Sequence, residues 1–461
     1  MTGPKALDTP HTPTRILAPE FRTATVGIVL TITLVAFEGM SVAVIMPTVT
    51  KELNALNLYG ISISAFLIAS LFANVVAGLW SDRRGYALPF LAGVVLFVAG
   101  MALAGAAQSA VLFLVARAVQ GLGAGASIVA LLVMIARVYP SGLRPKVFAA
   151  VSAAWVVPAM VGPAVAGFVA GHWGWRYVFF GIIPLVVPAL AMLVPALRMP
   201  SSSEAEPSQG PRSRPLAMTL AATATAGGAG VLLHGVDRLH VDAVPAAVET
   251  VAGLAFLVYG LYRLLPPRAL RFGRGLATTV LMRGFFSAAF FGVNSFIPLA
   301  LEEVKGFDPS YAGIALTTGA IGWSTGSYLQ SRQEGEAYKR IRLGAGCVTV
   351  AILICVLCVL PGVSGWIAVP AWIVAGFGMG FGMTTVSVTA LKQSPVNEQG
   401  ANSAALSVTD MLGSALSVGI GGALVNLIGH APAQISTGFA VISFLMAAIA
   451  LSATALAGRT R

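Results

Sequence analysis

The stretch Gly78–Tyr86 reads GLWSDRRGY and separates two long apolar runs of the chain. Its three consecutive charged residues must lie where a membrane helix meets water, because charge inside lipid is costly. Gly78 is expected to let two helices approach closely, and Gly85 to permit the tight turn into the next run. The stretch therefore predicts two membrane-spanning helices joined by a short loop, in which Asp82 and Arg83 are candidates to pair across a helix junction.

The composition extends this prediction to the whole chain. Of 461 residues, 57% are hydrophobic and only 10% are charged. Soluble globular domains carry about 25% charged residues. A soluble enzyme, a disordered chain and a secreted disulfide scaffold are therefore excluded, and an integral membrane protein with many helices remains.

Apolar runs long enough to cross a bilayer recur along the chain. A spanning helix needs about 20 mostly apolar residues. The first run is too long for a signal-peptide core and lacks a cleavage site, so it is counted as a span. Fourteen runs qualify: 24–47, 60–79, 88–107, 110–135, 147–170, 177–197, 217–236, 243–264, 276–301, 310–330, 342–361, 365–390, 402–427 and 433–456.

The distribution of Lys and Arg predicts the orientation. An even number of spans places both termini on one side, and the loops of that side hold 22 Lys and Arg against 4 on the other. By the positive-inside rule both termini are cytoplasmic, in a plasma (bacterial inner) membrane. The net charge of +11 reflects this bias, so no nucleic-acid partner is expected.

Two polar stretches, 198–216 and 265–275, divide the chain into groups of six, two and six spans. Two bundles of six spans are typical of transporters built from repeated halves. The predicted organisation is a cytoplasmic tail (1–23), an N-terminal six-helix bundle (24–197), a flexible cytoplasmic linker (198–216), two extra helices (217–264), a basic cytoplasmic loop (265–275), a C-terminal six-helix bundle (276–456) and a cytoplasmic tail (457–461).

Two further stretches carry motifs inside spans. Residues 114–125 read LVARAVQGLGAG and place Arg117 within the fourth span, one turn before Gly121. Residues 158–167 read PAMVGPAVAG, and their Gly162–Pro163 step is expected to bend or hinge the fifth span.

With the loop Gly78–Tyr86, these stretches resemble the signature motifs of the major facilitator superfamily. The resemblance implies an all-α major facilitator fold, here two six-helix bundles plus two extra central spans. It implies a cytoplasmic latch at Gly78, Asp82, Arg83 and Gly85, an intramembrane Arg117 linked to proton transfer, and hinges at Gly121, Gly162 and Pro163. The chain departs from the motifs at four positions: Tyr86 and Ala87 replace basic residues, and Pro158 and Ala166 replace glycines.

The layout resembles the fourteen-span drug:proton antiporter group of that superfamily. This group usually has an Asp in span 1, where residues 37–47 of this chain read FEGMSVAVIMP. Glu38 fills the acidic position, while Ala43 stands where the pattern has Asn. The resemblance implies export in exchange for protons, and the substituted span 5 motif keeps a symporter or a substrate-specific exporter open.

Four ionisable residues lie deep within spans: Glu38, Arg117, Arg283 and Asp410. By helix rise, Glu38 and Arg117 lie roughly 13 and 11 Å from the same membrane face. We expect Glu38 to carry the proton and Arg117 to tune it, because a nearby cation favours the ionised carboxylate and desolvation favours the protonated one. The alternative is a fixed structural ion pair. Arg283 and Asp410 also share a depth, so they either pair or make Asp410 a second protonation or cation-recognition site.

These features predict a proton-coupled secondary transporter that works by alternating access, with a multidrug efflux antiporter as the leading interpretation. Its partners would be the lipid bilayer, protons and an amphipathic or cationic drug-like compound. The alternative is a transporter of the same fold for one metabolite or lipid. No GxxxxGK[ST] nucleotide site, metal-ligand cluster or nucleophile–base pair occurs. We therefore expect no enzyme activity and no cofactor, with the proton gradient as energy source and a monomer as the working unit.

Overall fold

The computed structural model describes residues 15–140, 142–198, 215–333, 335–395 and 398–461. In these ranges the chain is helical and contains no strand. The α-helices are α1 (Arg22–Glu52), α2 (Tyr59–Arg84), α3 (Ala87–Gly105), α4 (Ala110–Val138), α5 (Arg144–Ala153), α6 (Val156–His172), α7 (Arg176–Leu197), α8 (Pro215–Arg238), α9 (Ala243–Leu264), α10 (Leu276–Asn294), α11 (Ile297–Lys305), α12 (Pro309–Arg332), α13 (Ala337–Val356), α14 (Ala368–Gln393), α15 (Gln399–Ile428) and α16 (Pro432–Leu456).

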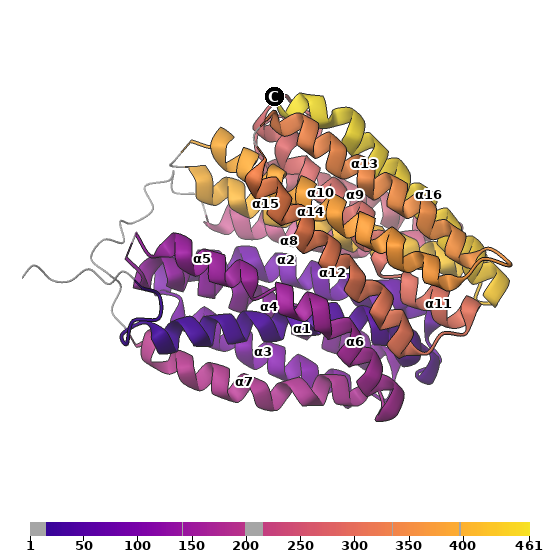
Figure 1. Cartoon of the computed structure of the whole chain (residues 1–461), viewed down its shortest axis with the longest axis horizontal. Coiled ribbons are helices and arrows are strands. Elements are labelled where there is room, and N and C mark those ends of the chain that lie inside the picture. Colours follow the sequence, from indigo (N-terminus) through magenta and orange to yellow (C-terminus); the bar gives the residue numbers. More distant parts are fainter. Residues whose placement is uncertain (1–14, 141, 199–214, 334, 396–397) are drawn as a thin grey trace, which may run out of the picture.

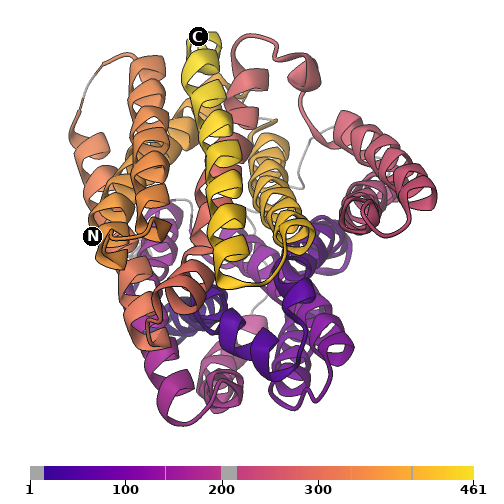
Figure 2. The ribbon, with the colours of Figure 1, turned by 90° about the vertical axis from the view of Figure 1, so that its right-hand side faces the viewer.

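The helices form two halves with a separate hairpin. Helices α1–α7 make one half and α10–α16 the other (Figure 1). Helices α8 and α9 pack against each other at the side of the molecule, where α8 contacts α2 and α15 (Figure 2). The expected linker, residues 198–216, lies mostly outside the described residues, as does most of the tail 1–23.

Thirteen of the fourteen expected spans correspond to helices long and apolar enough to cross a membrane. The exception is the expected span 310–330, which corresponds to α12. This helix has 24 residues but carries many Gly, Ser and Thr side chains. It packs against α6 and α14.

Two expected single spans are each divided into two helices, and a proline lies just after each break. A proline ring clashes with the carbonyl group four residues earlier. Four residues before Pro158 is Ala154, which caps α5 just before α6 begins. Four residues before Pro298 is Asn294, the last residue of α10. The expected spans 147–170 and 276–301 are therefore α5–α6 and α10–α11.

Close helix packing in the second half depends on glycines of α14. A Cβ atom at Gly376 would lie 1.9 Å from the carbonyl oxygen of Gly319, and one at Gly380 would lie 2.0 Å from that of Trp323. Small residues let membrane helices approach to backbone contact. These glycines therefore hold α14 directly against α12.

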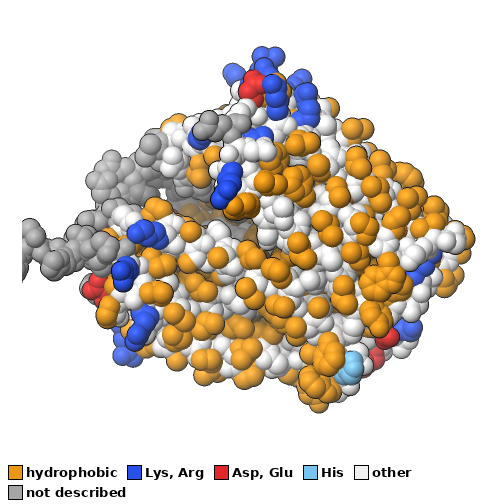
Figure 3. Space-filling view, viewed as in Figure 1, with side chains coloured by type: hydrophobic (Ala, Val, Ile, Leu, Met, Phe, Trp, Pro, Cys, Tyr) orange, Lys and Arg blue, Asp and Glu red, His pale blue; other side chains and the backbone are white. Residues whose placement is uncertain are grey.

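The two halves touch at one end of the molecule and diverge at the other. At the shared end, the Tyr59 hydroxyl donates to the Ser295 carbonyl oxygen at 2.6 Å. A Cβ atom at Gly60 would lie 2.6 Å from the Cα atom of Gly422. At the opposite end, where α2 finishes and α15 begins, the halves splay apart and the visible face is hollowed between them (Figures 1 and 3).

Candidate functional site

The first charged site lies inside the N-terminal half. Glu38 of α1 accepts a hydrogen bond and ion pair from Nη1 of Arg117 on α4. The same Nη1 donates to Oε1 of Gln120 at 2.6 Å. The ring of Phe66 on α2 covers the guanidinium, with Cζ 4.4 Å from the ring centroid. Three helices thus enclose one cation and one carboxylate.

This site is buried and incompletely paired. Glu38, Arg117 and Gln120 are 1%, 2% and 0% exposed. Glu38 Oε2, Arg117 Nε and Gln120 Nε2 have no hydrogen-bond partner among the described residues. Buried polar atoms are almost always satisfied, so such orphans call for an explanation. A free carboxylate oxygen beside a held cation is a place where a proton can bind.

Close packing of α2 on α4 brings the parts of this site together. A Cβ atom at Gly121 would lie 2.2 Å from the carbonyl oxygen of Phe66, and one at Gly125 would lie 2.3 Å from that of Ser70. Only glycine permits this approach, which sets the Phe66 ring over Arg117. The hinge role expected for Gly121 stays a prediction.

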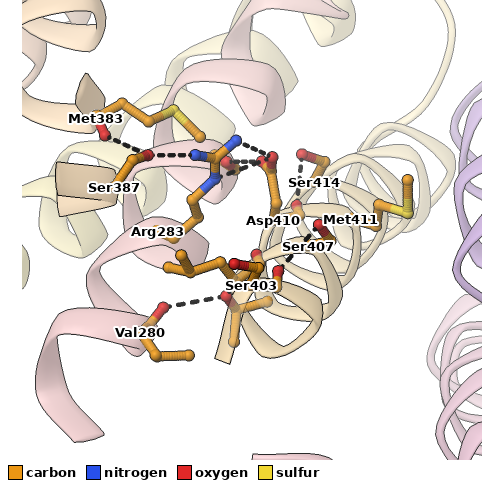
Figure 4. Close-up of polar contacts among 12 residues, drawn as sticks. Val280, Arg283, Met383, Ser387, Ser403, Ser407, Asp410, Met411 and Ser414 are labelled. Atoms are coloured by element: carbon orange, nitrogen blue, oxygen red, sulfur yellow. Dashed lines mark hydrogen bonds and ion pairs between the residues drawn. The ribbon is translucent and has the colours of Figure 1, made fainter. Parts of the chain in front are cut away.

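The second charged site lies inside the C-terminal half and joins three helices (Figure 4). Arg283 of α10 donates to Asp410 Oδ2 on α15 from Nη2 at 2.8 Å and from Nε at 3.2 Å. Its Nη1 donates to the Ser387 hydroxyl on α14 at 2.7 Å. The Ser287 hydroxyl, one turn along α10, donates to Asp410 Oδ1. Arg283 and Asp410 are therefore paired, the first of the two arrangements expected from their depth.

This second site is partly open. The side chains of Arg283 and Asp410 are 26% and 25% exposed. Met411, the next residue on α15, contacts the Asn74 amide of α2 with its sulfur at 3.0 Å. The pair therefore lies beside the plane where the two halves meet.

The loop after α2 only partly matches its expected role. Gly85 has φ +84° and donates its amide to the Ser81 carbonyl oxygen at 3.0 Å, so it makes the expected tight turn. Asp82 and Arg83 are exposed, and no ion pair of Asp82 occurs among the described residues. The close approach of two helices expected at Gly78 is not found. A Cβ atom added there would meet only Val129, at an ordinary van der Waals distance of 3.6 Å.

The Gly162–Pro163 step serves a contact between the halves. Helix α6 runs unbroken through Pro163. The carbonyl oxygen of Pro163 would lie 2.4 Å from a Cβ atom at Gly313 of α12. The step is thus a close crossing of α6 and α12, and its expected action as a hinge stays a prediction.

Comparison with known families agrees with the helical arrangement. The sequence profile of the Major Facilitator Superfamily matches residues 28–418. The chain belongs to this superfamily. The all-helical, many-span membrane architecture is the one that the sequence motifs implied.

Relatives in this superfamily are distant transporters. An uncharacterised MFS-type transporter of Mycobacterium tuberculosis is 28% identical over 70% of this chain and 48% of its own length. The multidrug efflux pump SdrM of Staphylococcus aureus is 21% identical over 68% of this chain and 70% of the pump. Efflux pump mlcE of Penicillium citrinum is 25% identical over 83% of this chain and 73% of the pump. The chain spans about half the length of the mycobacterial relative and of an Aspergillus aculeatus relative.

Solved structures share the fold. Peptide transporter POT, in complex with sulfate, superposes with a TM-score of 0.68 at 16% identity, covering 95% of this chain and 94% of that one. A mutant of nucleoside transporter NupG superposes with a TM-score of 0.65 at 12% identity, covering 94% of this chain and 99% of that one. At these identities the likeness concerns the major facilitator fold alone.

Sequence reasoning missed four members of the two charged sites. Gln120 and Ser287 could have been found from their spacing, because residues three or four apart share a helix face. Gln120 is three residues after Arg117, and Ser287 is four after Arg283. Phe66 and Ser387 had no such signal, since each reaches its arginine from another helix of this superfamily fold.

Proposed function

We propose that this chain is a proton-coupled antiporter that exports amphipathic or cationic drug-like compounds by alternating access. The observation that carries the proposal is the buried cluster of Glu38, Arg117 and Gln120, in which one carboxylate oxygen has no partner among the described residues. An intramembrane ionisable group is costly and is by default functional. We count α12 as the fourteenth span and place both termini in the cytoplasm of a plasma membrane.

In this cluster, proton binding to Glu38 could transfer Arg117 from Glu38 to its other partners. With Glu38 ionised, Arg117 bridges it to Gln120. Protonation of the free oxygen would neutralise the carboxylate and weaken the ion pair. Gln120 Oε1 and the Phe66 ring would still hold the guanidinium. Proton binding therefore changes the force between α1 and α4 without expelling a charge into lipid.

In the proposed cycle, the arrangement of the halves corresponds to the inward-facing step. Under the proposed topology, the contacts at Tyr59 and Gly60 close the outer side, and the hollow opens to the cytoplasm. An ionised, paired Glu38 suits an inward-facing state that has released its proton and awaits substrate. The outward-facing state would then be the one in which Glu38 takes up a proton.

The second charged site supplies the substrate side of the proposal. Asp410 is a quarter exposed beside the plane between the halves. A cationic substrate could replace Arg283 as the partner of Asp410, leaving Arg283 with Ser387. The names of two relatives, a multidrug efflux pump and an efflux pump, support export.

A second candidate function is transport of one metabolite or lipid. It is favoured by the substitutions Pro158 and Ala166 in the motif associated with exporters. The helix is interrupted between Ala153 and Val156, just before Pro158, so the local backbone differs from a continuous helix at this point.

The test is a substrate panel in inverted vesicles, with collapse of an imposed pH gradient as the signal. Wild type should respond to several unrelated cations, and Glu38→Gln should lose the response while still folding. Glu336→Gln, an exposed carboxylate outside the spans, is the matched control and should transport normally. Unimpaired, gradient-driven transport by Glu38→Gln would overturn the proposal. A response to a single metabolite would instead establish the second candidate.

A further inference from the structure

A groove runs along the outer face of α13. It has a volume of about 550 Å³, and its lining is mostly apolar: Lys339, Arg342, Leu343, Gly346, Cys347, Val350 and, from α14, Val374. The α13 members recur every three or four residues, so they share one helix face. The eleven steps from Lys339 to Val350, at 1.5 Å each, give a length of roughly 16 Å. That is about half of a hydrocarbon core of ~30 Å.

The groove exists because small residues interrupt this face. A Cβ atom built at Gly346 would meet nothing within 4 Å. The flanking side chains of Leu343 and Val350 are 53% and 52% exposed. On a candidate membrane span (Ala337–Val359), such a face borders the lipid.

One end of the groove is strongly cationic. Lys339, Arg342 and Arg461 surround the Tyr338 ring, with the Arg461 Cζ atom 3.7 Å and the Arg342 Cζ atom 5.7 Å from its centroid. Glu336 lies among them and pairs with Lys339 at 2.6 Å. Figure 3 shows a group of blue Lys and Arg side chains at the top of the molecule, above an apolar face.

We propose that this groove is a binding site for an anionic phospholipid. One acyl chain would lie along Leu343, Gly346 and Val350, and the phosphate would lie between Lys339 and Arg342. The stems of Lys and Arg pack on apolar surface while their charged ends stay at the interface. Basic residues at the end of a membrane helix attract anionic headgroups. A neutral lipid would match the apolar length but leave the cations unused.

The test uses the full chain purified in detergent and titrated with phosphatidylglycerol or phosphatidylcholine. Bound lipid is counted by native mass spectrometry. We expect phosphatidylglycerol to bind in preference, and affinity to fall about fivefold for each of Lys339→Gln and Arg342→Gln, from roughly 1 kcal/mol per basic residue. Arg332→Gln is the matched control, because Arg332 ends the neighbouring α12 at the same end, stacked on Tyr328, and it should bind as wild type.

A second variant separates the groove from general charge attraction. Gly346→Leu fills the open space and should abolish phosphatidylglycerol binding while leaving all the cations in place. Gly181→Leu on α7, where an added side chain also meets nothing, is its control. Equal binding of the two lipids, unchanged binding in both the charge variants and Gly346→Leu, or equal binding of glycerol phosphate without acyl chains would each overturn the proposal.

Discussion

Each half of the molecule holds one arginine–carboxylate pair, and the two pairs differ in their access to water. Arg117 and Glu38 are 2% and 1% exposed, whereas Arg283 and Asp410 are 26% and 25% exposed. The dry pair is enclosed by an amide and an aromatic ring, and the wetter pair by two hydroxyl groups. The proposed function uses this difference: it assigns the proton to the sealed pair of the N-terminal half and the charge of the substrate to the more exposed pair of the C-terminal half.

The sharpest way to break this comparison is to remove one arginine at a time. Arg117→Leu leaves Glu38 buried without a cation, which should cost about 3–5 kcal/mol of folding stability. Arg283→Leu should cost less, about 1–3 kcal/mol, because water can replace part of the interaction. Denaturant unfolding in detergent measures both.

The double variant Glu38→Leu/Arg117→Leu serves as the control for that experiment. It removes both charges, so it should recover most of the stability lost by Arg117→Leu. Equal losses from the two single arginine variants would show that the difference in burial has no energetic consequence.

A smaller effect, on transport, is expected when only the charge of Asp410 in the more exposed pair is removed. Asp410→Asn should weaken the apparent affinity for a cationic substrate about tenfold, roughly 1.4 kcal/mol. Transport of a neutral analogue of the same shape should be retained, since Glu38 is untouched. Concentration dependence of uptake into inverted vesicles distinguishes the two. An equal loss for both substrates would assign Asp410 to structure or coupling.

Chemical labelling sharpens the comparison with little change in stability. In a Cys347→Ala background, Ser387→Cys should react with a water-soluble thiol reagent, because Ser387 is only partly buried beside Arg283. Ser41→Cys, one turn from Glu38 and 0% exposed, should not react. Substrate should slow labelling of the first variant. Rapid labelling of Ser41→Cys would contradict a dry N-terminal site.

The smallest effect on stability is expected at the exposed carboxylate Asp82. Asp82→Asn should leave unfolding within about 0.5 kcal/mol of wild type, as surface substitutions usually do. If Asp82 latches the opposite state of the cycle, transport should nevertheless fall. Full transport activity in this variant would count against the latch.

The fold was largely predictable from the sequence, since hydrophobic length alone locates most spans. Two features escaped this reasoning. Hydropathy averages over a window and cannot register that two spans are each interrupted just before a proline, Pro158 in one and Pro298 in the other. The packing of α12 depends on Gly319 and Gly322 facing α14, which hydropathy counts only as weakly apolar.

The charged sites were predictable in part. Depth along the helices correctly brought Glu38 to Arg117 and Arg283 to Asp410. Depth says nothing about rotation around the helix axis, so it could not distinguish a sealed pair from an open one. The motif also led to a wrong expectation of close helix packing at Gly78. A glycine in a motif shows that a side chain is absent, but it does not show which neighbouring helix, if any, packs closely there.

The contact of Gly60 with Gly422 has a consequence for the balance between states. Two backbones meet there with no side chain between them, so this conformation requires glycine at both positions. A single methyl group would act against it while leaving any state with the halves apart at that point unaffected. A protein changes its conformational populations by the difference in free energy between states. In the proposed transport cycle, a single carbon atom added at residue 60 is therefore expected to shift the resting population away from this conformation.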